Sequence, residues 1–196
     1  MKVVLTSSHS ANNKAVFDLT TKNHSEYCKR HDYTYMPVEE PYHPKLDIPF
    51  VKKLINEYDV VVNIGCDVVI QHPETPITVY ANPGVTVGRE LLGTLNGDLI
   101  LFTKEAMSTV DAIDKLHRYM GSSQDAINFL AKHNNGIFVE PWLQIAAKEL
   151  NTHLDYTYVC YNDYFAVHYQ KIGYVPVINE KVKYLSASEI LKQRSE

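Results

Sequence analysis

One stretch of the sequence decides the fold: Asp59-Val60-Val61-Val62-Asn63-Ile64-Gly65-Cys66-Asp67-Val68-Val69-Ile70. Its first half is nearly continuously apolar, as expected of a central strand that is covered on both faces. Gly65 and Cys66 end this run, and apolar residues resume directly after Asp67. Asp67 is therefore a carboxylate at the point where a buried strand ends. Ligands of open α/β sheets bind at such strand ends.

Strand and helix patterns alternate on the N-terminal side of this stretch. The predicted elements are a strand at 2–6, a helix to about Arg30, a strand at about 33–37, a helix from Asp47 to about Tyr58 and the strand at 59–64. Strand, helix, strand, helix, strand predicts an α/β fold with a mainly parallel central sheet flanked by helices.

The second half of the chain predicts a more mixed set of elements. They are strands at 85–88 and 98–103, helices at 105–119, 123–132 and 142–150, and a strand-rich, tyrosine-rich segment at 155–177. A last helix is expected from Ser186, because Ser186 and Glu189 have the spacing of a capping box. A length of 196 residues suits one domain, spanning 1–196.

Composition disfavours nucleic acid as a partner without excluding it, and it bears on the compartment of the protein. The formal net charge of -4 does not supply the positive field that nucleic-acid backbones require. Cys28, Cys66 and Cys160 lie far apart without a CxxC spacing, so we expect three unpaired thiols in a reducing compartment. We find no signal peptide before the first strand and no run of ~20 apolar residues. We therefore expect a cytoplasmic protein of bacterial or viral type.

The stretch around Asp67 resembles the strand, DxD and strand signature of nucleotide-sugar glycosyltransferases with the GT-A fold, a Rossmann-like α/β fold. In that family the carboxylates hold Mn²⁺ or Mg²⁺ on the diphosphate of the donor, and these hard cations prefer oxygen ligands. Gly65 stands where the family has its first acid, so the motif is degenerate. The resemblance implies that Asp67 is a metal ligand and that Cys66 lies beside the donor.

Two further segments resemble the retaining galactosyl- and xylosyltransferase branch of this family. Residues 27–35 are similar to the segment in which a helix ends in Tyr-Cys and a Tyr-rich strand follows, and Lys45 falls where that branch has a lysine. Residues 95–102 resemble its Asn-x-Gly strand, although here glycine follows asparagine directly. The resemblance implies that Asn96 and Gly97 approach the transferred sugar.

A third segment, Ser123-Gln124-Asp125-Ala126-Ile127-Asn128, resembles the Asp-Gln-Asp-Ala-Leu-Asn helix start of the retaining enzymes. Ser123 replaces the first acid and is expected to cap the helix. Gln124 and Asp125 then become catalytic candidates, because a helix N-terminus and polar side chains can orient hydroxyls and a developing charge. The alternative interpretation is a plain capping turn of a surface helix.

The strand at 165–169 resembles the C-terminal strand in which a histidine closes the metal site, which makes His168 the second candidate metal ligand. The alternative is a core or surface histidine. Thr6, Ser7 and Ser8 end the first strand, where family members hold the base and ribose. Five histidines show no ligand-like spacing and are expected at the surface: His24, His72, His117, His133 and His153.

The resemblance implies transfer of a hexose or pentose from a nucleotide-diphosphate donor, with UDP expected, to an acceptor hydroxyl of a glycan, a protein or another compound, with retention. Residues 1–103 would bind the donor, and residues 104–196 would form the acceptor side. One alternative is a non-catalytic nucleotide-sugar or glycan binding module, because Gly65 and Ser123 replace acids. Another is a nucleotidyltransferase, but residues 7–10 lack its Gly-rich phosphate loop.

Overall fold

The structure is a computed structural model that describes residues 1–9, 14–38, 47–89, 95–133, 135–146, 165–168, 175–177 and 183–185. The strands of its main sheet are β1 (Val3–Ser8), β2 (Thr34–Val38), β3 (Val60–Gly65), β5 (Val85–Arg89), β6 (Leu95–Thr103) and β7 (Ile137–Glu140). The helices are α1 (Lys14–His31), α2 (Ile48–Glu57), α3 (Met107–Met120) and α4 (Ser123–Lys132), with the 3₁₀ helices η2 (Ile77–Tyr80) and η3 (Lys104–Ala106).

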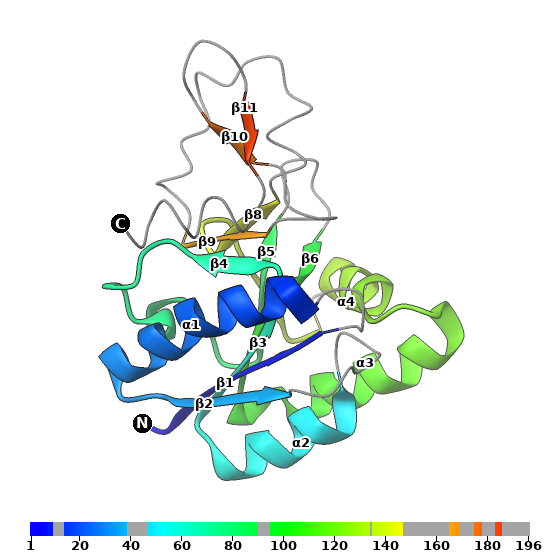
Figure 1. Ribbon diagram of the computed structural model, residues 1–196. Helices are drawn as coiled ribbons and strands as arrows, with labels where there is room; N and C mark the ends of the chain where they lie inside the picture. The colour runs from blue at the N-terminus through cyan, green and yellow to red at the C-terminus, as the bar shows by residue number, and fades with distance from the viewer. Residues whose placement is uncertain are drawn as a thin grey trace.

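The main sheet has the strand order β2-β1-β3-β6-β5-β7 (Figure 1). β1 is parallel to β2 and β3, β6 is antiparallel to both of its neighbours, and β7 is parallel to β5. Five of the six strands therefore run in one direction, and only β6 runs in the other. The α/β fold with a mostly parallel sheet and flanking helices is as predicted.

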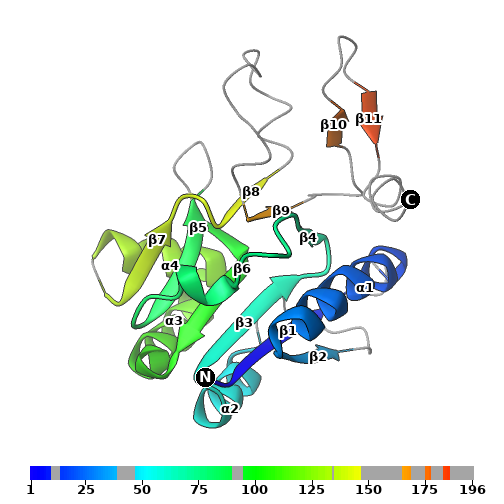
Figure 2. The same cartoon turned by 90° about the vertical axis from the view of Figure 1, so that its left-hand side faces the viewer.

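Two smaller sheets complete the described structure. One contains β4 (Val68–Ile70), β9 (Ala166–His168) and β8 (Gln144–Ala146), in the order β4-β9-β8. The other pairs β10 (Val175–Val177) with β11 (Lys183–Leu185). Figure 2 shows the three-stranded sheet beyond the end of β3. The segment after Gly65 thus leaves the main sheet and at once joins a second one.

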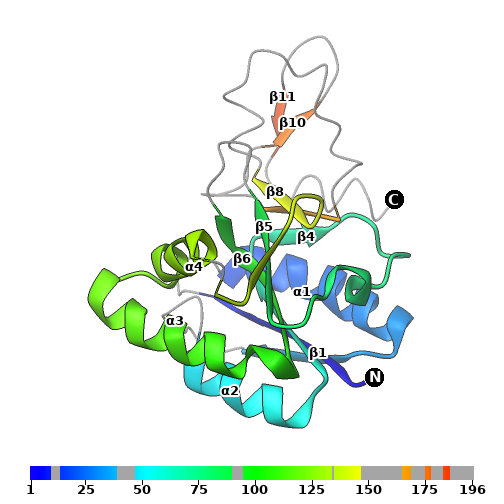
Figure 3. The same cartoon turned by 180° about the vertical axis from the view of Figure 1, so that it is seen from behind.

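The prediction that the strands at 3–5 and 60–62 are central neighbours is confirmed. Val3 lies opposite Val60 and Leu5 lies opposite Val62 in a parallel pair. All of these side chains are buried, since helices cover both faces of the sheet. α1 lies on the face seen in Figure 1, and α2, α3 and α4 lie on the face seen in Figure 3.

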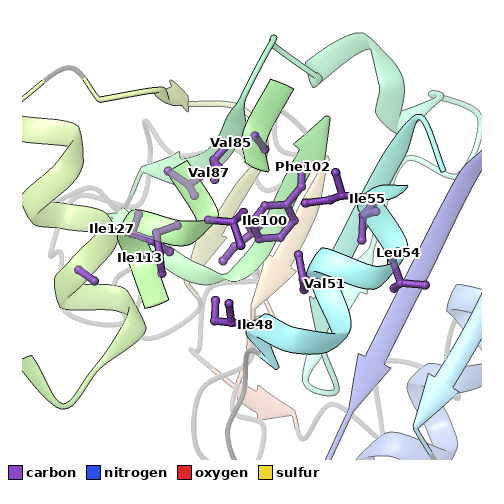
Figure 4. Packing of buried hydrophobic residues seen from close by; sticks show 14 of the residues in the cluster. Ile48, Val51, Leu54, Ile55, Val85, Val87, Ile100, Phe102, Ile113 and Ile127 are labelled. Carbon is purple, nitrogen blue, oxygen red and sulfur yellow. The ribbon is translucent and has the colours of Figure 1, made fainter. Parts of the chain in front are cut away.

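The face toward α2, α3 and α4 is closed by apolar packing (Figure 4). Val51, Leu54 and Ile55 of α2 pack with Ile100 and Phe102 of β6, and all five are almost fully buried. α2 begins as predicted, because the Asp47 carboxylate accepts a hydrogen bond from the Phe50 N–H at 3.0 Å. This packing fixes α2 against β6.

The structure corrects three boundaries. β6 begins at Leu95 rather than at residue 98, because pairing with β5 continues past a register shift at Val87/Gly88. Ser122, not Ser123, caps α4, since its hydroxyl accepts from the Asp125 N–H at 3.3 Å. The helix predicted at 142–150 is wrong at its start, because Gln144–Ala146 form β8 and pair with β9.

Other predictions have mixed outcomes. His24 is fully buried, so its expected place at the surface is wrong. Cys28 and Cys66 are both buried thiols, and Cys160 lies outside the described residues. The helix expected from Ser186 also lies outside them. Among the helices that the structure describes, none has the length and apolar character of a membrane crossing.

Candidate functional site

The ends of β1 and β3 meet the start of β6 at one edge of the main sheet. Thr6 lies opposite Asn63, and Ser8 lies opposite Gly65. Because β6 is antiparallel, its first residues reach the same edge, and Asp98 lies beside Gly65. The reversed strand thus adds a carboxylate to the hydroxyl and amide groups that β1 and β3 bring to this edge.

A cavity of about 220 Å³ opens beside this edge. Its lining comes from β1, β2, β3 and the start of α2: Thr6, Ser8, Val38, Asp47, Phe50, Val51 and Asn63. Asn63 is 8% exposed and is the one amide in an otherwise apolar strand. An amide offers both donors and an acceptor, so the cavity combines apolar walls with groups that can recognise a polar ring.

Ser7 is separated from Thr6 and Ser8, although the three residues are consecutive. Successive side chains of a strand point to opposite faces of a sheet. Ser7 is buried on the α1 side, where its hydroxyl lies 2.9 Å from the Tyr35 hydroxyl. Burial raises the pKa of Tyr35, so this phenol stays protonated. Of the three donor-binding candidates at the end of β1, Thr6 and Ser8 line the cavity and Ser7 does not.

Asp67 lies in the turn between β3 and β4, with its carboxylate over Gly65. A Cβ atom built on Gly65 would be 3.0 Å from Asp67 Oδ1 and 3.4 Å from Asp98 Cβ. Both aspartates therefore lie in contact distance of the place that a first acid of the motif would occupy. Asp98 is 5% exposed, and its N–H donates to Asn96 Oδ1 at 2.9 Å. Sequence analysis missed Asp98, although an acid beginning an apolar strand is a usable signal.

The structure describes the main-chain position of His168 but not that of Lys45. β9 pairs antiparallel with β4 and places His168 opposite Val68, the residue after Asp67. His168 and Asp67 are thus brought to adjacent main-chain positions, although they are distant in sequence. Lys45 lies outside the described residues. Within the residues that are described, no three His, Cys, Asp or Glu side chains are gathered around a point that could hold a metal ion.

The start of α4 lies against the start of β6. A Cβ on Gly97 would be 3.8 Å from both Cβ and Oε1 of Gln124. Asn128 fixes this contact, because its Oδ1 accepts from the Leu95 N–H at 3.0 Å and its amide donates to Gln124 O at 2.9 Å. Gln124 is half-buried and Asp125 is exposed in the first turn of α4. The structure thus brings Gln124 and Gly97 together.

Gln144 braces Asn96, a second role that sequence analysis missed. Its Nε2 donates to Asn96 O at 3.0 Å and lies 3.4 Å from Leu99 O. The side chain is buried, and a Cβ on Gly88 would overlap Gln144 Cγ. Glycine at position 88 therefore makes room for the brace. No short sequence pattern contains this signal, since the contact joins residues 48 positions apart.

Comparisons with known proteins find similarity in structure alone. The sequence matches no protein-family model and no curated protein. A glycosyltransferase involved in the glycosylation of the major capsid of PBCV-1 has a TM-score of 0.67 and 13% identity, with all of both chains covered. The galactosyltransferase LgtC, crystallised with donor and acceptor sugar analogues, has a TM-score of 0.55 and 12% identity over 98% of this chain and 94% of LgtC.

A third similar structure is the apo form of the glycosyltransferase GlyE from Streptococcus pneumoniae. It has a TM-score of 0.61 and 12% identity over 98% of this chain and 63% of GlyE. At such identities the similarity establishes the fold, which is that of GT-A glycosyltransferases.

Proposed function

We propose that this chain is a glycosyltransferase that moves a sugar from a nucleotide-diphosphate donor, with UDP the expected nucleotide, to an acceptor hydroxyl with retention. The observation that carries the proposal is the pair Asp67 and Asp98, which both lie against Gly65 at the carboxyl end of β1 and β3, where a cavity opens. In this proposal residues 1–103 bind the donor, and residues 104–196 form the acceptor side.

The cavity suits the base and ribose of the donor. Val38 and Phe50 provide apolar surface for a flat ring, and the Asn63 amide supplies both kinds of hydrogen-bonding group that a pyrimidine edge needs. Thr6 and Ser8 add hydroxyl groups at the same wall. This part of the proposal replaces Ser7 with Asn63 among the donor-binding residues.

The aspartates fit a divalent cation. Asp67 places a carboxylate oxygen beside Gly65 and Asp98 brings a second acid to the same position, and oxygen is the ligand type that Mn²⁺ and Mg²⁺ prefer. The pairing of β4 with β9 supports His168 as a further ligand. A cation held there would neutralise charge on the leaving diphosphate. Cys66 and Lys45 are also proposed to lie beside the diphosphate. For Cys66 the reason is that it directly precedes Asp67 in the chain.

The sugar is assigned to the region where α4 meets β6. Asn128 holds the main chain of Gln124 beside Gly97, and Gln144 holds the main chain of Asn96, so the backbone that carries these polar groups is fixed before a ligand arrives. Preorganised groups orient a substrate at low entropic cost. Asp125 stands in the first turn of α4, where the helix dipole favours its negative charge. A cytoplasmic location and a glycan or protein acceptor complete the proposal.

The test is turnover with a panel of UDP-, GDP- and ADP-sugars in the presence of Mn²⁺. We expect hydrolysis or transfer with one donor, loss of activity in EDTA, and a rate at least ~100-fold lower for Asp67→Asn and for Asp98→Asn. Asp18→Asn is the matched control, because Asp18 is an exposed carboxylate paired with Lys14 on α1. His168→Ala should lose activity that excess Mn²⁺ partly restores.

The main alternative is a non-catalytic module that binds nucleotide sugars, which Gly65 in place of an acid favours. Binding of one donor without hydrolysis or transfer across the panel would establish the module and overturn the enzyme. A donor that is neither bound nor turned over would overturn both. Full activity of Asp67→Asn and Asp98→Asn in EDTA would remove the cation from the proposal.

A further inference from the structure

One side of α1 is polar and nevertheless faces the protein. Five of its side chains bond to the main chain between Cys66 and Ile77: Thr20, Asn23, His24, Tyr27 and His31. Residues three, four and seven apart lie on the same side of a helix, so these side chains form one row. The segment that they hold begins immediately after β3.

The first three side chains of this row hold the turn and strand around Asp67. Thr20 Oγ1 donates to Cys66 O at 2.7 Å. His24 Nε2 lies 2.8 Å from Val68 O, and it must donate because a carbonyl only accepts. Asn23 makes two bonds to one residue: its Nδ2 donates to Ile70 O at 3.1 Å, and its Oδ1 accepts from the Ile70 N–H at 2.9 Å.

The bonded residues alternate along the chain. The carbonyls of Cys66, Val68 and Ile70 point to α1, while the strand that contains Val69 pairs with β9 on its other edge. This is the period of an extended strand, whose alternate residues present their polar groups to the same edge. Asp67 therefore lies between two carbonyls that α1 holds in place.

Burial makes these hydrogen bonds costly to break. Thr20 and His24 have no exposed surface, and a buried polar group that loses its partner costs about 1–3 kcal/mol. Burial also lowers the pKa of His24 to about 4, so the ring is neutral near pH 7 and has a single N–H to donate. A displacement of the turn would break several buried bonds together, so the path of residues 66–70 is strongly restrained.

We propose that Thr20, Asn23 and His24 are positioning residues that fix residues 66–70 and thereby hold the Asp67 carboxylate over Gly65. The proposal rests on the proposed function, because it takes Asp67 as the ligand of a donor-bound cation. It predicts that a hydrogen bond made by a helix remote from the cavity sets the affinity for a metal–nucleotide complex. None of the three side chains has to touch the donor for this effect.

The experiment compares Thr20→Val, which keeps the shape and loses the hydroxyl, with Thr20→Ser, which keeps the hydroxyl. Tyr27→Phe is the matched control, since it removes hydrogen bonds between the same helix and residues 75 and 77, beyond β4. We measure the dissociation constant of UDP with Mn²⁺ by calorimetry and hydrogen exchange of the peptide covering residues 66–70. We expect Thr20→Val to weaken binding about tenfold and speed exchange there, because partners behind a metal ligand contribute about that much.

Thr20→Ser should restore both values, and Tyr27→Phe should lower the thermal stability without changing either. Equal weakening by Thr20→Val and Tyr27→Phe would overturn the positioning proposal and leave the proposed function standing, because it would reflect general loss of stability. Faster exchange at 66–70 with unchanged affinity would also overturn it. If the wild-type protein binds no metal–nucleotide complex, the proposed function fails and the positioning proposal fails with it.

Discussion

The two faces of the main sheet are covered by different chemistry. Toward α2, α3 and α4 the contacts are apolar, with Val51, Ile100 and Phe102 among the buried side chains (Figure 4). Toward α1, apolar contacts of the sheet are joined by the polar row from Thr20 to His31, which binds main-chain groups beyond β3. The same sheet thus has one face closed mainly by apolar packing, with Asn128 bonding the main chain only at the start of β6, and another face that relies on a whole row of directed hydrogen bonds.

The difference follows from what lies under each helix. Regular strands pair their own N–H and C=O groups, so a helix that covers them needs only apolar surface. Residues 66–77 contain a turn, a short strand and the first residue of a 3₁₀ helix, and many of their main-chain groups lie outside a strand ladder. Buried main-chain groups must be satisfied, and α1 does this with side chains. Polar burial therefore accompanies irregular backbone next to the site.

The largest effect is expected on the apolar face. Phe102 is fully buried between β6 and α2, so Phe102→Ala should lower the free energy of unfolding by about 4 kcal/mol. A urea titration measures this loss. Phe102→Leu fills part of the same space and should cost clearly less. Similar values for the two variants would show that packing does not dominate this face.

On the α1 face, acid should break the contact at His24. Folding lowers the pKa of His24 from 6.5 to about 4 through burial, so its stabilising effect is complete above pH 6.5 and disappears as the pH falls through 4. The full loss corresponds to about 3 kcal/mol. Unfolding by urea at pH 7 and pH 4.5 should show a smaller decrease for His24→Gln, which cannot become charged, than for the wild type. Parallel decreases would contradict this origin.

Tyr27 tests a single polar contact of the same face. Its hydroxyl donates to Thr75 O at 3.0 Å and accepts from the Ile77 N–H at 2.6 Å. Tyr27→Phe leaves both main-chain groups without this hydroxyl and should cost about 2 kcal/mol, measured by the same titration. An unchanged free energy of unfolding would mean that the hydrogen bonds from α1 do not stabilise residues 75–77.

The smallest effect on the free energy of unfolding is expected for the surface ion pairs between α2 and α3. Lys52 of α2 lies 2.6 Å from Asp111 and 3.7 Å from Asp114 of α3. All three side chains reach solvent, Asp111 the most, and water and salt weaken such ion pairs. Lys52→Ala should change the free energy of unfolding by no more than the error of a urea titration, at low or high salt. A clear loss at low salt would show that this face also depends on charge.

The sequence predicts the regular part of the fold because burial on two faces leaves a continuous apolar pattern. The strand at 60–64 is the clearest case, and its end places Asp67 at the edge of the sheet. The start of β6 was not predicted, because Asn96 and Gly97 are typical turn residues. Their strand geometry comes from pairing with β5 and from the side chains of Asn128 and Gln144, which are distant in sequence.

The polar row of α1 shows the limit more sharply. His24 was expected at the surface because it has no ligand-like spacing to another histidine. Its partner Val68 lies 44 positions away, so no local pattern contains the contact. Asp98 was missed for a related reason. Only the register of β3 against β6 places it beside Gly65, and that register depends on tertiary pairing.

The two hydrogen bonds between the Asn23 side chain and the Ile70 main chain also bear on self-association. β4 ends the three-stranded sheet, and its residues Val68–Ile70 are buried and β-branched. An open strand edge of this kind is a template on which another molecule can add a strand. The Asn23 amide occupies the polar groups of Ile70 as a neighbouring strand would. Detachment of α1 would therefore expose the unpaired edge of β4 to other molecules. Local loss of this helix should then be detected as aggregation before global unfolding is detected.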